Sequence, residues 1–454
     1  MIATRAMALD PADDVDELRR AVRELKQQIQ ALSKRTSELE TERDAALKER
    51  DATSNAARAL SELKAPAAPA DTNTARNPQD ATALPGTVSI GPSVPANPIA
   101  SGGQDVRVTL SGQINRALLY GNDGYDSKLR NVDNNNSSTR IRIFGVGQLD
   151  ADTFVGGQIE TEIRSNTSAR VRLRDDGAPS ADSVTFTERQ LEVIGYSRRY
   201  GRVRLGQGST ASDEVTQADL SDTALAGYVQ VSDFDGGFEF RPKNSMGYGP
   251  QVSNVFNYFS GLIRDDRIRY DTPSFEGFTA STSAIDGGAW DAALRYAGQN
   301  EYLRVVAAVG YANASSRDKP LPATTALNSQ QVSGSVSVLY RPLGLSLTGA
   351  AGERHADYTD ANGASLQPRL WYGKLGWQHR FVSFGGTAFS IDFAQNQSLS
   401  QAHDNARAYG FEVVQHVDRV GTDLFLGYRD QRLDREGTSF NALRALMSGV
   451  RVRF

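Results

Sequence analysis

Pairs of arginine residues separated by one residue recur along the chain, and such pairs can supply fixed positive charge to an aqueous site. Three of these pairs are Arg140 and Arg142, Arg202 and Arg204, and Arg267 and Arg269. Residues i and i+2 of a β-strand face the same side, so each pair would present two guanidinium groups to one surface. Arg189 has the parity of Leu191 and Val193, and we expect it to face the other way.

An acidic segment could oppose these cations. Residues 209–240 contain seven carboxylates and no lysine, arginine or histidine. The seven are Asp213, Glu214, Asp219, Asp222, Asp233, Asp235 and Glu239. Opposed fixed charges across a narrow, wet passage orient dipolar solutes and set ion preference. We therefore predict a pore constriction composed of Arg140, Arg142, Arg202, Arg204, Arg267, Arg269, Asp233, Asp235, Glu160 and Glu162. A solvated acidic loop with rim arginines is the alternative.

The elements that would position these charges are β-strands. From residue 105 onward, short period-two segments alternate with turn residues, and no helical period is sustained. Sixteen strands are expected, near 106–120, 138–150, 153–165, 185–198, 202–208, 266–272, 276–286, 289–298, 301–313, 330–341, 344–354, 368–380, 385–395, 406–417, 420–431 and 440–454. Tight joins such as SRRYG (197–201) contrast with long polar joins such as 165–183. This asymmetry between two rims is typical of an outer-membrane barrel.

Side-chain alternation agrees with a barrel that has a wet interior. Ile159 and Ile163 face one side of their strand, whereas Glu160 and Glu162 face the other. No apolar run reaches the ~18 residues of a membrane-spanning helix, but lipid-facing strands give no such signal. Aromatic residues collect near strand ends, as in interfacial girdles. They are Tyr120, Tyr196, Trp290, Tyr296, Tyr311, Tyr340, Trp371, Trp377, Tyr428 and Phe454.

The N-terminal region has a different pattern. Residues 13–63 are expected to form a coiled-coil helix, because apolar positions alternate in steps of three and four. The seam residues are Val15, Leu18, Val22, Leu25, Ile29, Leu32, Thr36 and Leu39. Dimer and trimer stay open, and a single solvated helix is the alternative. Residues 64–104 contain seven of the sixteen prolines and read as a linker. Residues 1–12 are either a signal-peptide remnant or a disordered start.

Composition and motifs exclude several functions. The formal net charge is -4 and basic residues are interleaved singly, which argues against a nucleic-acid partner. The chain has no cysteine, and its four histidines share no ligand spacing. No nucleophile elbow, zinc-protease motif or phosphate-binding glycine loop is present, so we expect no enzyme, no cofactor and no metal site. The loop NVDNNNSS (131–138) lacks the spaced acidic ligands of a calcium site.

Several stretches together resemble the general diffusion porins of Gram-negative bacteria. They are STRIRIFGVGQL, FVGGQIETEI, YGRVRLGQGS, DRIRYDTPSFEGF and the closing phenylalanine, and the similarity spans residues 105–454. The run SDFDGG (232–237) resembles the family's acidic loop tip PEFGG but lacks its proline. The coiled coil resembles that of a porin subgroup that favours dicarboxylates. The resemblance implies that the loop at about 209–265 folds into the lumen and that Phe454 belongs to the signal read by the barrel-assembly machinery.

The expected fold is therefore all-β: a 16-stranded antiparallel transmembrane β-barrel at residues 105–454, preceded by an N-terminal α-helical coiled coil. The expected function is an outer-membrane porin that forms a passive water-filled channel for small hydrophilic solutes and ions. Its expected partners are further copies in a homotrimer, outer-membrane lipids, the barrel-assembly machinery and, through a periplasmic coiled coil, peptidoglycan. The alternative is a structural anchor whose coiled coil tethers the membrane to the cell wall.

Overall fold

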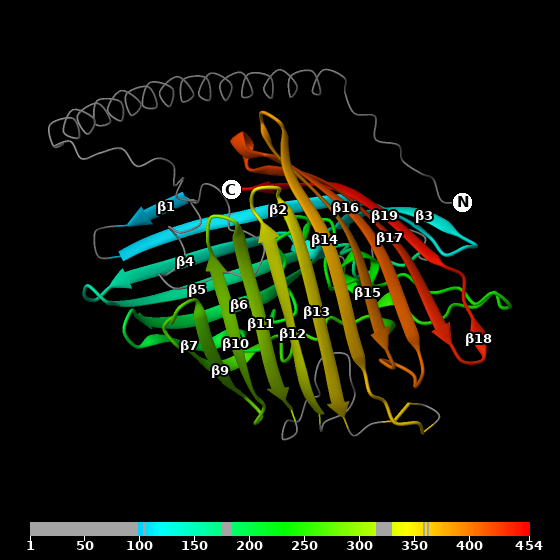
Figure 1. Cartoon of the computed structure of the whole chain (residues 1–454), viewed down its shortest axis with the longest axis horizontal. Helices are drawn as coiled ribbons and strands as arrows, with labels where there is room; N and C mark the ends of the chain where they lie inside the picture. The colour runs from blue at the N-terminus through cyan, green and yellow to red at the C-terminus, as the bar shows by residue number, and fades with distance from the viewer. Residues whose placement is uncertain (1–98, 103–105, 175–183, 315–328, 357–358, 361–362) are drawn as a thin grey trace, which may run out of the picture. The chain divides into compact units, whose positions relative to one another are not determined.

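A computed structural model describes residues 99–102, 106–174, 184–314, 329–356, 359–360 and 363–454 (Figure 1). The predicted signal-peptide remnant, coiled coil with its seam residues, and most of the linker lie outside the described residues. Within the described residues, no helix combines the length and apolar character needed to cross a membrane.

Sixteen long strands form one closed antiparallel sheet, as predicted. They are β2 (Val106–Asn122), β4 (Arg140–Gln148), β5 (Thr153–Ser165), β6 (Val184–Ser197), β7 (Gly201–Ser209), β8 (Arg264–Asp271), β9 (Phe278–Ile285), β10 (Trp290–Gln299), β11 (Leu303–Asn313), β12 (Ser329–Tyr340), β13 (Leu345–Ala356), β14 (Arg369–Val382), β15 (Gly385–Gln397), β16 (Asn405–Val417), β17 (Thr422–Arg435) and β19 (Leu443–Arg453). Strand β2 pairs with β4 on one edge and with β19 on the other, so the sheet closes on itself. Figure 1 shows β10 to β17 side by side.

The structure also has short strands and helices that the alternating sequence pattern does not predict. The short strands are β1 (Ile99–Gly102), β3 (Ser127–Asp133) and β18 (Thr438–Ser439), and the short helices are η2 (Asn135–Ser137), α2 (Ser232–Asp235), α3 (Val252–Val255) and η3 (Asp418–Val420). Strand β3 pairs with residues 116–122 of β2, beyond the stretch that pairs with β4. The two strands thus extend as a hairpin past the end of β4.

The barrel has two unlike ends. At one end the strands are joined by tight turns, such as residues 149–152, 198–200 and 383–384, and we call it the short-turn end. Strand β2 begins and strand β19 ends on this side. At the opposite, long-loop end, β5 and β6 are joined by residues 166–183. The strands alternate apolar outward with polar inward residues, so Ile159 is exposed whereas Glu160 is only 1 % exposed. This pattern is the one required of a barrel with lipid outside and water inside.

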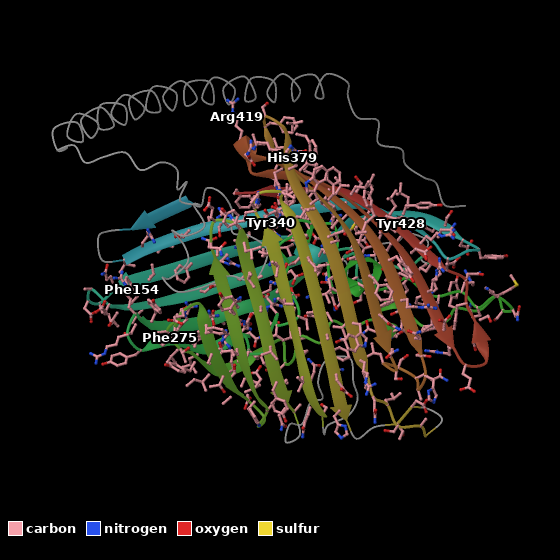
Figure 2. All side chains as sticks on the ribbon, in the orientation of Figure 1. Phe154, Phe275, Tyr340, His379, Arg419 and Tyr428 are labelled. Carbon is pink, nitrogen blue, oxygen red and sulfur yellow. The ribbon has the colours of Figure 1, made fainter. Side chains whose placement is uncertain are left out.

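Aromatic side chains mark both edges of the outer apolar band. On β14, Trp371 and Trp377 are both exposed and lie six residues apart. At about 3.3 Å per residue this separation is roughly 20 Å, close to the height of a membrane-facing band. Figure 2 places Tyr340 and Tyr428 on the wall of the barrel, and the Trp290 and Tyr311 rings pack at 5.3 Å between centroids.

The connection between β7 and β8, residues 210–263, folds into the barrel, and we call it the inner loop. Its five phenylalanine side chains are fully buried, and they are Phe234, Phe238, Phe240, Phe256 and Phe259. They join one apolar cluster with wall residues of β2 and β13 to β19. Small wall residues make room: at Gly427 an added Cβ would lie 2.4 Å from the carbonyl oxygen of Ala226. The core of this protein therefore sits inside the barrel, between the inner loop and one side of the wall.

Polar contacts fix the inner loop to the same side of the wall. Strand β12 presents three serines at alternate positions, and they bind loop backbone groups. The Ser333 hydroxyl donates to the carbonyl of Phe259 over 2.7 Å, and Ser335 donates to Val215 over 2.7 Å. The Ser337 hydroxyl accepts from the Leu220 N–H over 3.0 Å. The wall from β12 to β17 is thus covered, and the wall from β4 to β10 remains open to a cavity.

Candidate functional site

A cavity of about 770 Å³ lies between the inner loop and the wall strands β4 to β10. Among the described residues its lining includes ten arginines and six carboxylates, and it includes no lysine. The arginines are Arg140, Arg142, Arg164, Arg189, Arg198, Arg202, Arg204, Arg264, Arg269 and Arg295, and the carboxylates are Glu160, Glu162, Asp213, Glu214, Asp233 and Asp271. Fixed charges concentrated in one water-filled passage act strongly on ions that cross it.

One part of this lining, the paired group, is an ion-pair ladder between adjacent strands. Arg142 of β4 donates from Nε to Glu160 Oε2 over 2.6 Å, and Arg189 of β6 donates from Nε to Glu160 Oε1 over 2.6 Å. Arg140 Nη1 lies 3.6 Å from the same Oε1. Glu162 is shared between Arg189, at 3.2 Å, and Arg164, at 3.2 Å. The β4 and β6 cations are therefore balanced by carboxylates of β5, the strand between them.

The inner loop contributes three further carboxylates to the paired group, Asp213, Glu214 and Asp233. Arg264, the first residue of β8, lies 3.9 Å from Asp213 and 3.7 Å from Glu214. Glu214 adopts a left-handed backbone with φ 64°, and its N–H donates to the Ser260 hydroxyl over 2.6 Å. Such a conformation is costly for a residue other than glycine and persists where its surroundings enforce it.

Asp233 points to the cavity from α2. Its carboxylate accepts from the Asn135 amide over 2.6 Å and from the Tyr228 hydroxyl over 2.5 Å. Burial raises the pKa of Asp233 to about 6, against the opposing effect of these two hydrogen bonds. Burial, with the like charge of Asp213 beside it, also raises the pKa of Glu214. Both loop carboxyls therefore hold their protons to higher pH than free carboxyls.

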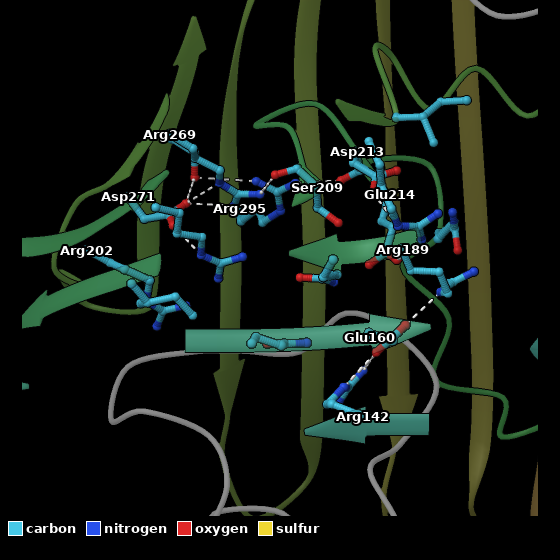
Figure 3. A pocket seen from close by; sticks show the side chains of 18 of the residues that line it. Arg142, Glu160, Arg189, Arg202, Ser209, Asp213, Glu214, Arg269, Asp271 and Arg295 are labelled. Carbon is cyan, nitrogen blue, oxygen red and sulfur yellow. Dashed lines mark hydrogen bonds and ion pairs between the residues drawn. The ribbon is translucent and has the colours of Figure 1, made fainter. Parts of the chain in front are cut away.

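A second part of the lining, the arginine cluster, comprises Arg202, Arg204, Arg269 and Arg295 around the single carboxylate Asp271. Arg269 donates to Asp271 Oδ1 from Nε over 2.9 Å and from Nη2 over 2.7 Å. Arg295 donates from Nη2 to the loop carbonyls of Ala211 and Asp213, each over 2.7 Å. Figure 3 shows Arg202, Arg269, Arg295 and Asp271 on one side of the cavity, apart from Arg142, Glu160 and Arg189.

Comparison with known proteins decides the family. The profile of the Gram-negative porins matches residues 68–436, which is most of the chain. The chain belongs to the Gram-negative porin family. Its fold is similar to that of the anion-selective porin from Comamonas acidovorans, at a TM-score of 0.51 and 15% identity over 77% of this chain and 100% of that one. The fold is also similar to the trimer form of OmpT from Vibrio cholerae, at a TM-score of 0.50 and 12% identity over 77% of this chain and 100% of that one. OmpF of Salmonella typhi is similar at a TM-score of 0.50 and 13% identity over 78% of this chain and 100% of that one. No curated protein sequence matches.

The porin is accordingly an outer-membrane channel protein. Of the ten residues predicted at its constriction, eight line the cavity: Arg140, Arg142, Arg202, Arg204, Arg269, Asp233, Glu160 and Glu162. Arg267 does not, because its guanidinium is enclosed between Glu192 and the carbonyls of Ser209, at 3.1 Å, and Gly206, at 2.7 Å. Asp235 does not, because it faces the wall from the inner loop, where the amide of Gln431 on β17 donates to it over 2.8 Å.

Several lining residues of the porin were not predicted from the sequence. Arg189 is the extra residue of a bulge, since Glu160 pairs with Gln190 whereas Thr161 pairs with Glu188. A bulge shifts the alternation by one, so Arg189 faces inward despite its parity. Arg264 and Arg295 have no partner at i+2 that would mark them as a pair. Tyr196, expected in the girdle, lines the cavity next to Arg202 instead.

Proposed function

We propose that the cavity is the constriction of a passive channel that prefers small hydrophilic anions. The observation that carries this proposal is the imbalance between the ten arginines and the six carboxylates of the described lining, a difference of four positive charges. Because the pKa of Asp233 is about 6, this carboxyl is protonated in mildly acidic medium. The excess of positive charge in the lining is then five instead of four.

The location of these charges determines how strongly they act on a passing ion. Bulk salt screens charges over about 8 to 10 Å, so residues on an open surface affect permeation little. Residues that face each other across a cavity of about 770 Å³ lie within that distance of every solute that passes. The side chains of the paired group and the arginine cluster therefore form the electrostatic filter in this proposal.

Reversal potentials test it. The purified porin is inserted into planar bilayers that separate two potassium chloride solutions of different concentration, and the potential at zero current is measured. The sign that corresponds to chloride preference supports the proposal, and a cation preference contradicts it. A barrel that inserts without conducting would favour the structural anchor instead.

Assembly and attachment belong to the same proposal. A trimer form is known for the similarly folded OmpT, which supports a homotrimer here. The short-turn end would face the periplasm, as it does in bacterial outer-membrane barrels, and the coiled coil at 13–63 and linker at 64–104 would extend from it toward peptidoglycan. The barrel-assembly machinery would read Phe454 during insertion. Deletion of residues 1–98 should leave conduction intact, and loss of oligomers in that variant would assign the coiled coil to assembly.

A further inference from the structure

The excess positive charge of the cavity resides in the arginine cluster. The paired group contains five arginines and five carboxylates, so its charges cancel. The arginine cluster contains four arginines and one carboxylate, which leaves three uncompensated positive charges. The remaining lining arginine, Arg198, lies in the join between β6 and β7. An anion drawn into the cavity is therefore drawn to the cluster rather than to the paired group.

Arg202 is the member of the cluster that most clearly lacks a protein partner. It is only 7 % exposed, and within the described part of the chain its guanidinium has no hydrogen bond and no ion pair. Arg202 lies opposite Asp271 in the register between β7 and β8, but no hydrogen bond or ion pair joins them, and its guanidinium lies over the Tyr196 ring, whose centroid is 5.7 Å from Arg202 Cζ. A buried cation that forms no ion pair is costly, so the site is more stable when an anion occupies it.

Asp271 cannot fill this role. Its Oδ1 already accepts from Arg269 and from the Ser281 hydroxyl, the latter over 2.7 Å. Arg204 approaches Asp271 Oδ2 only to 3.7 Å, and no hydrogen bond joins them. Arg204 also lies directly opposite Arg269 in the register between β7 and β8. Like charges that face each other across two strands repel, and an anion between them would remove that repulsion.

The cluster is held in place before any solute arrives. Arg269 donates from Nη1 to the Thr210 carbonyl over 2.8 Å, and Arg295 is held by two carbonyls of the following residues. These carbonyls belong to the first turn of the inner loop, so the loop that narrows the cavity also orients the cluster. Guanidinium groups oriented in this way match the paired oxygens of an oxyanion.

We propose that Arg202, Arg204, Arg269 and Arg295 form a binding subsite for a tetrahedral, doubly charged oxyanion group, such as the phosphate of a phosphate monoester on a permeating solute. The inference rests on the proposed anion-preferring channel and deepens it. Three uncompensated charges favour a dianion over a monoanion. The subsite lies close to the short-turn end, because Arg202 is the second residue of β7. A solute would pass the paired group and then bind at the cluster before it leaves.

Block of chloride current by sulfate tests the subsite. Potassium sulfate is added in steps to the full-length porin in planar bilayers, with acetate as the singly charged comparison. The chloride current should fall to a plateau with a defined half-block concentration for sulfate, and acetate should need a concentration at least about tenfold higher. Arg202→Ser should raise the half-block concentration for sulfate about tenfold, which corresponds to one charge-assisted hydrogen-bonded contact.

Arg142→Ser is the matched control, because it removes the same charge from the paired group. It should shift the reversal potential as Arg202→Ser does, while the half-block concentration stays within about twofold of wild type. Arg204→Ser gives a second variant if Arg202→Ser does not fold, since the contacts of Arg204 with carboxylates are long, at 3.7 and 4.0 Å. It too should weaken the block.

The outcomes separate the two proposals. If the wild-type reversal potential shows no anion preference, the proposed function fails. If anion preference is present but sulfate block does not saturate, the subsite is wrong. The subsite is equally wrong if acetate blocks as well as sulfate, or if Arg142→Ser weakens the block as much as Arg202→Ser.

Discussion

Arg189 Nε donates a hydrogen bond to Glu160 Oε1 over 2.6 Å, and this contact joins β6 to β5 at the wall of the cavity. Glu160 is thereby shared among three arginines, since Arg142 and Arg140 approach it from β4. One carboxylate thus restrains the charge of three cations. The balance of the paired group depends more on Glu160 than on any other single side chain.

Glu160→Gln should increase anion preference. The change removes the carboxylate shared by Arg140, Arg142 and Arg189, so one further positive charge would act on passing ions. The reversal potential in a potassium chloride gradient should move toward the chloride limit. Glu353→Gln is the control, because Glu353 is exposed, pairs with Arg369 and does not line the cavity. An unchanged reversal potential in Glu160→Gln would mean that this carboxylate is outside the ion path.

Anion preference should fall as pH rises from 5 to 7. Asp233, with its pKa raised by burial to about 6, is neutral below this range and negative above it, so deprotonation adds a negative charge to the cavity. Asp233→Asn should flatten this dependence and increase anion preference at pH 7. The dependence should not vanish, because the pKa of Glu214 is raised as well. Reversal potentials measured at each pH provide the readout.

Asp235→Asn is the matched variant for Asp233→Asn. Asp235 is two residues away but lies outside the cavity lining, against Gln431. Its replacement should leave the reversal potential at pH 7 close to wild type. Equal effects of the two variants would show that exposure to the cavity does not decide which carboxylate acts on passing ions.

Arg429→Met should destabilise the barrel strongly. Arg429 is buried beneath the inner loop, where it pairs with Asp392 and lies 3.4 Å from Glu412, both buried. Removing the cation breaks a buried ion pair, and such a loss costs about 3 to 5 kcal/mol. Denaturant unfolding in lipid vesicles measures it. Arg407→Met, which breaks a largely exposed pair with Asp434, should change the free energy of unfolding by less than about 1 kcal/mol.

Phe454→Asp should impair assembly in cells but not refolding of the purified protein. The backbone of Phe454 closes the barrel seam with Gly112 through hydrogen bonds of 2.8 and 3.0 Å, and these survive the substitution. The residue as a whole is 42 % exposed, so it is accessible for recognition. Phe454→Tyr, which keeps an aromatic ring, is the control. Normal outer-membrane levels of Phe454→Asp would argue against the terminal signal.

The strands were predictable because a barrel wall imposes alternation on every residue pair, and their predicted positions agree with the observed ones to within a few residues. The constriction was predictable only in part. Asp233 and Asp235 would share a face in an extended segment, but they lie in α2, where residues two apart point to nearly opposite sides. Arg267 has the inward parity predicted for it, yet the contacts that enclose it come from residues of β6 and β7 that no local pattern reveals.

The inner loop divides the inside of this barrel into two surfaces under different constraints. Strands β12 to β17 face the loop with alanine, glycine, serine and buried ion pairs, and a change of volume there would be felt as in the core of a soluble protein. Strands β4 to β10 face the cavity with arginine and carboxylate side chains that are bounded by water. Substitutions on that side can change which solutes pass without disturbing what holds the loop in place. The residues that maintain the fold and those that can alter permeation thus lie on different strands of one wall.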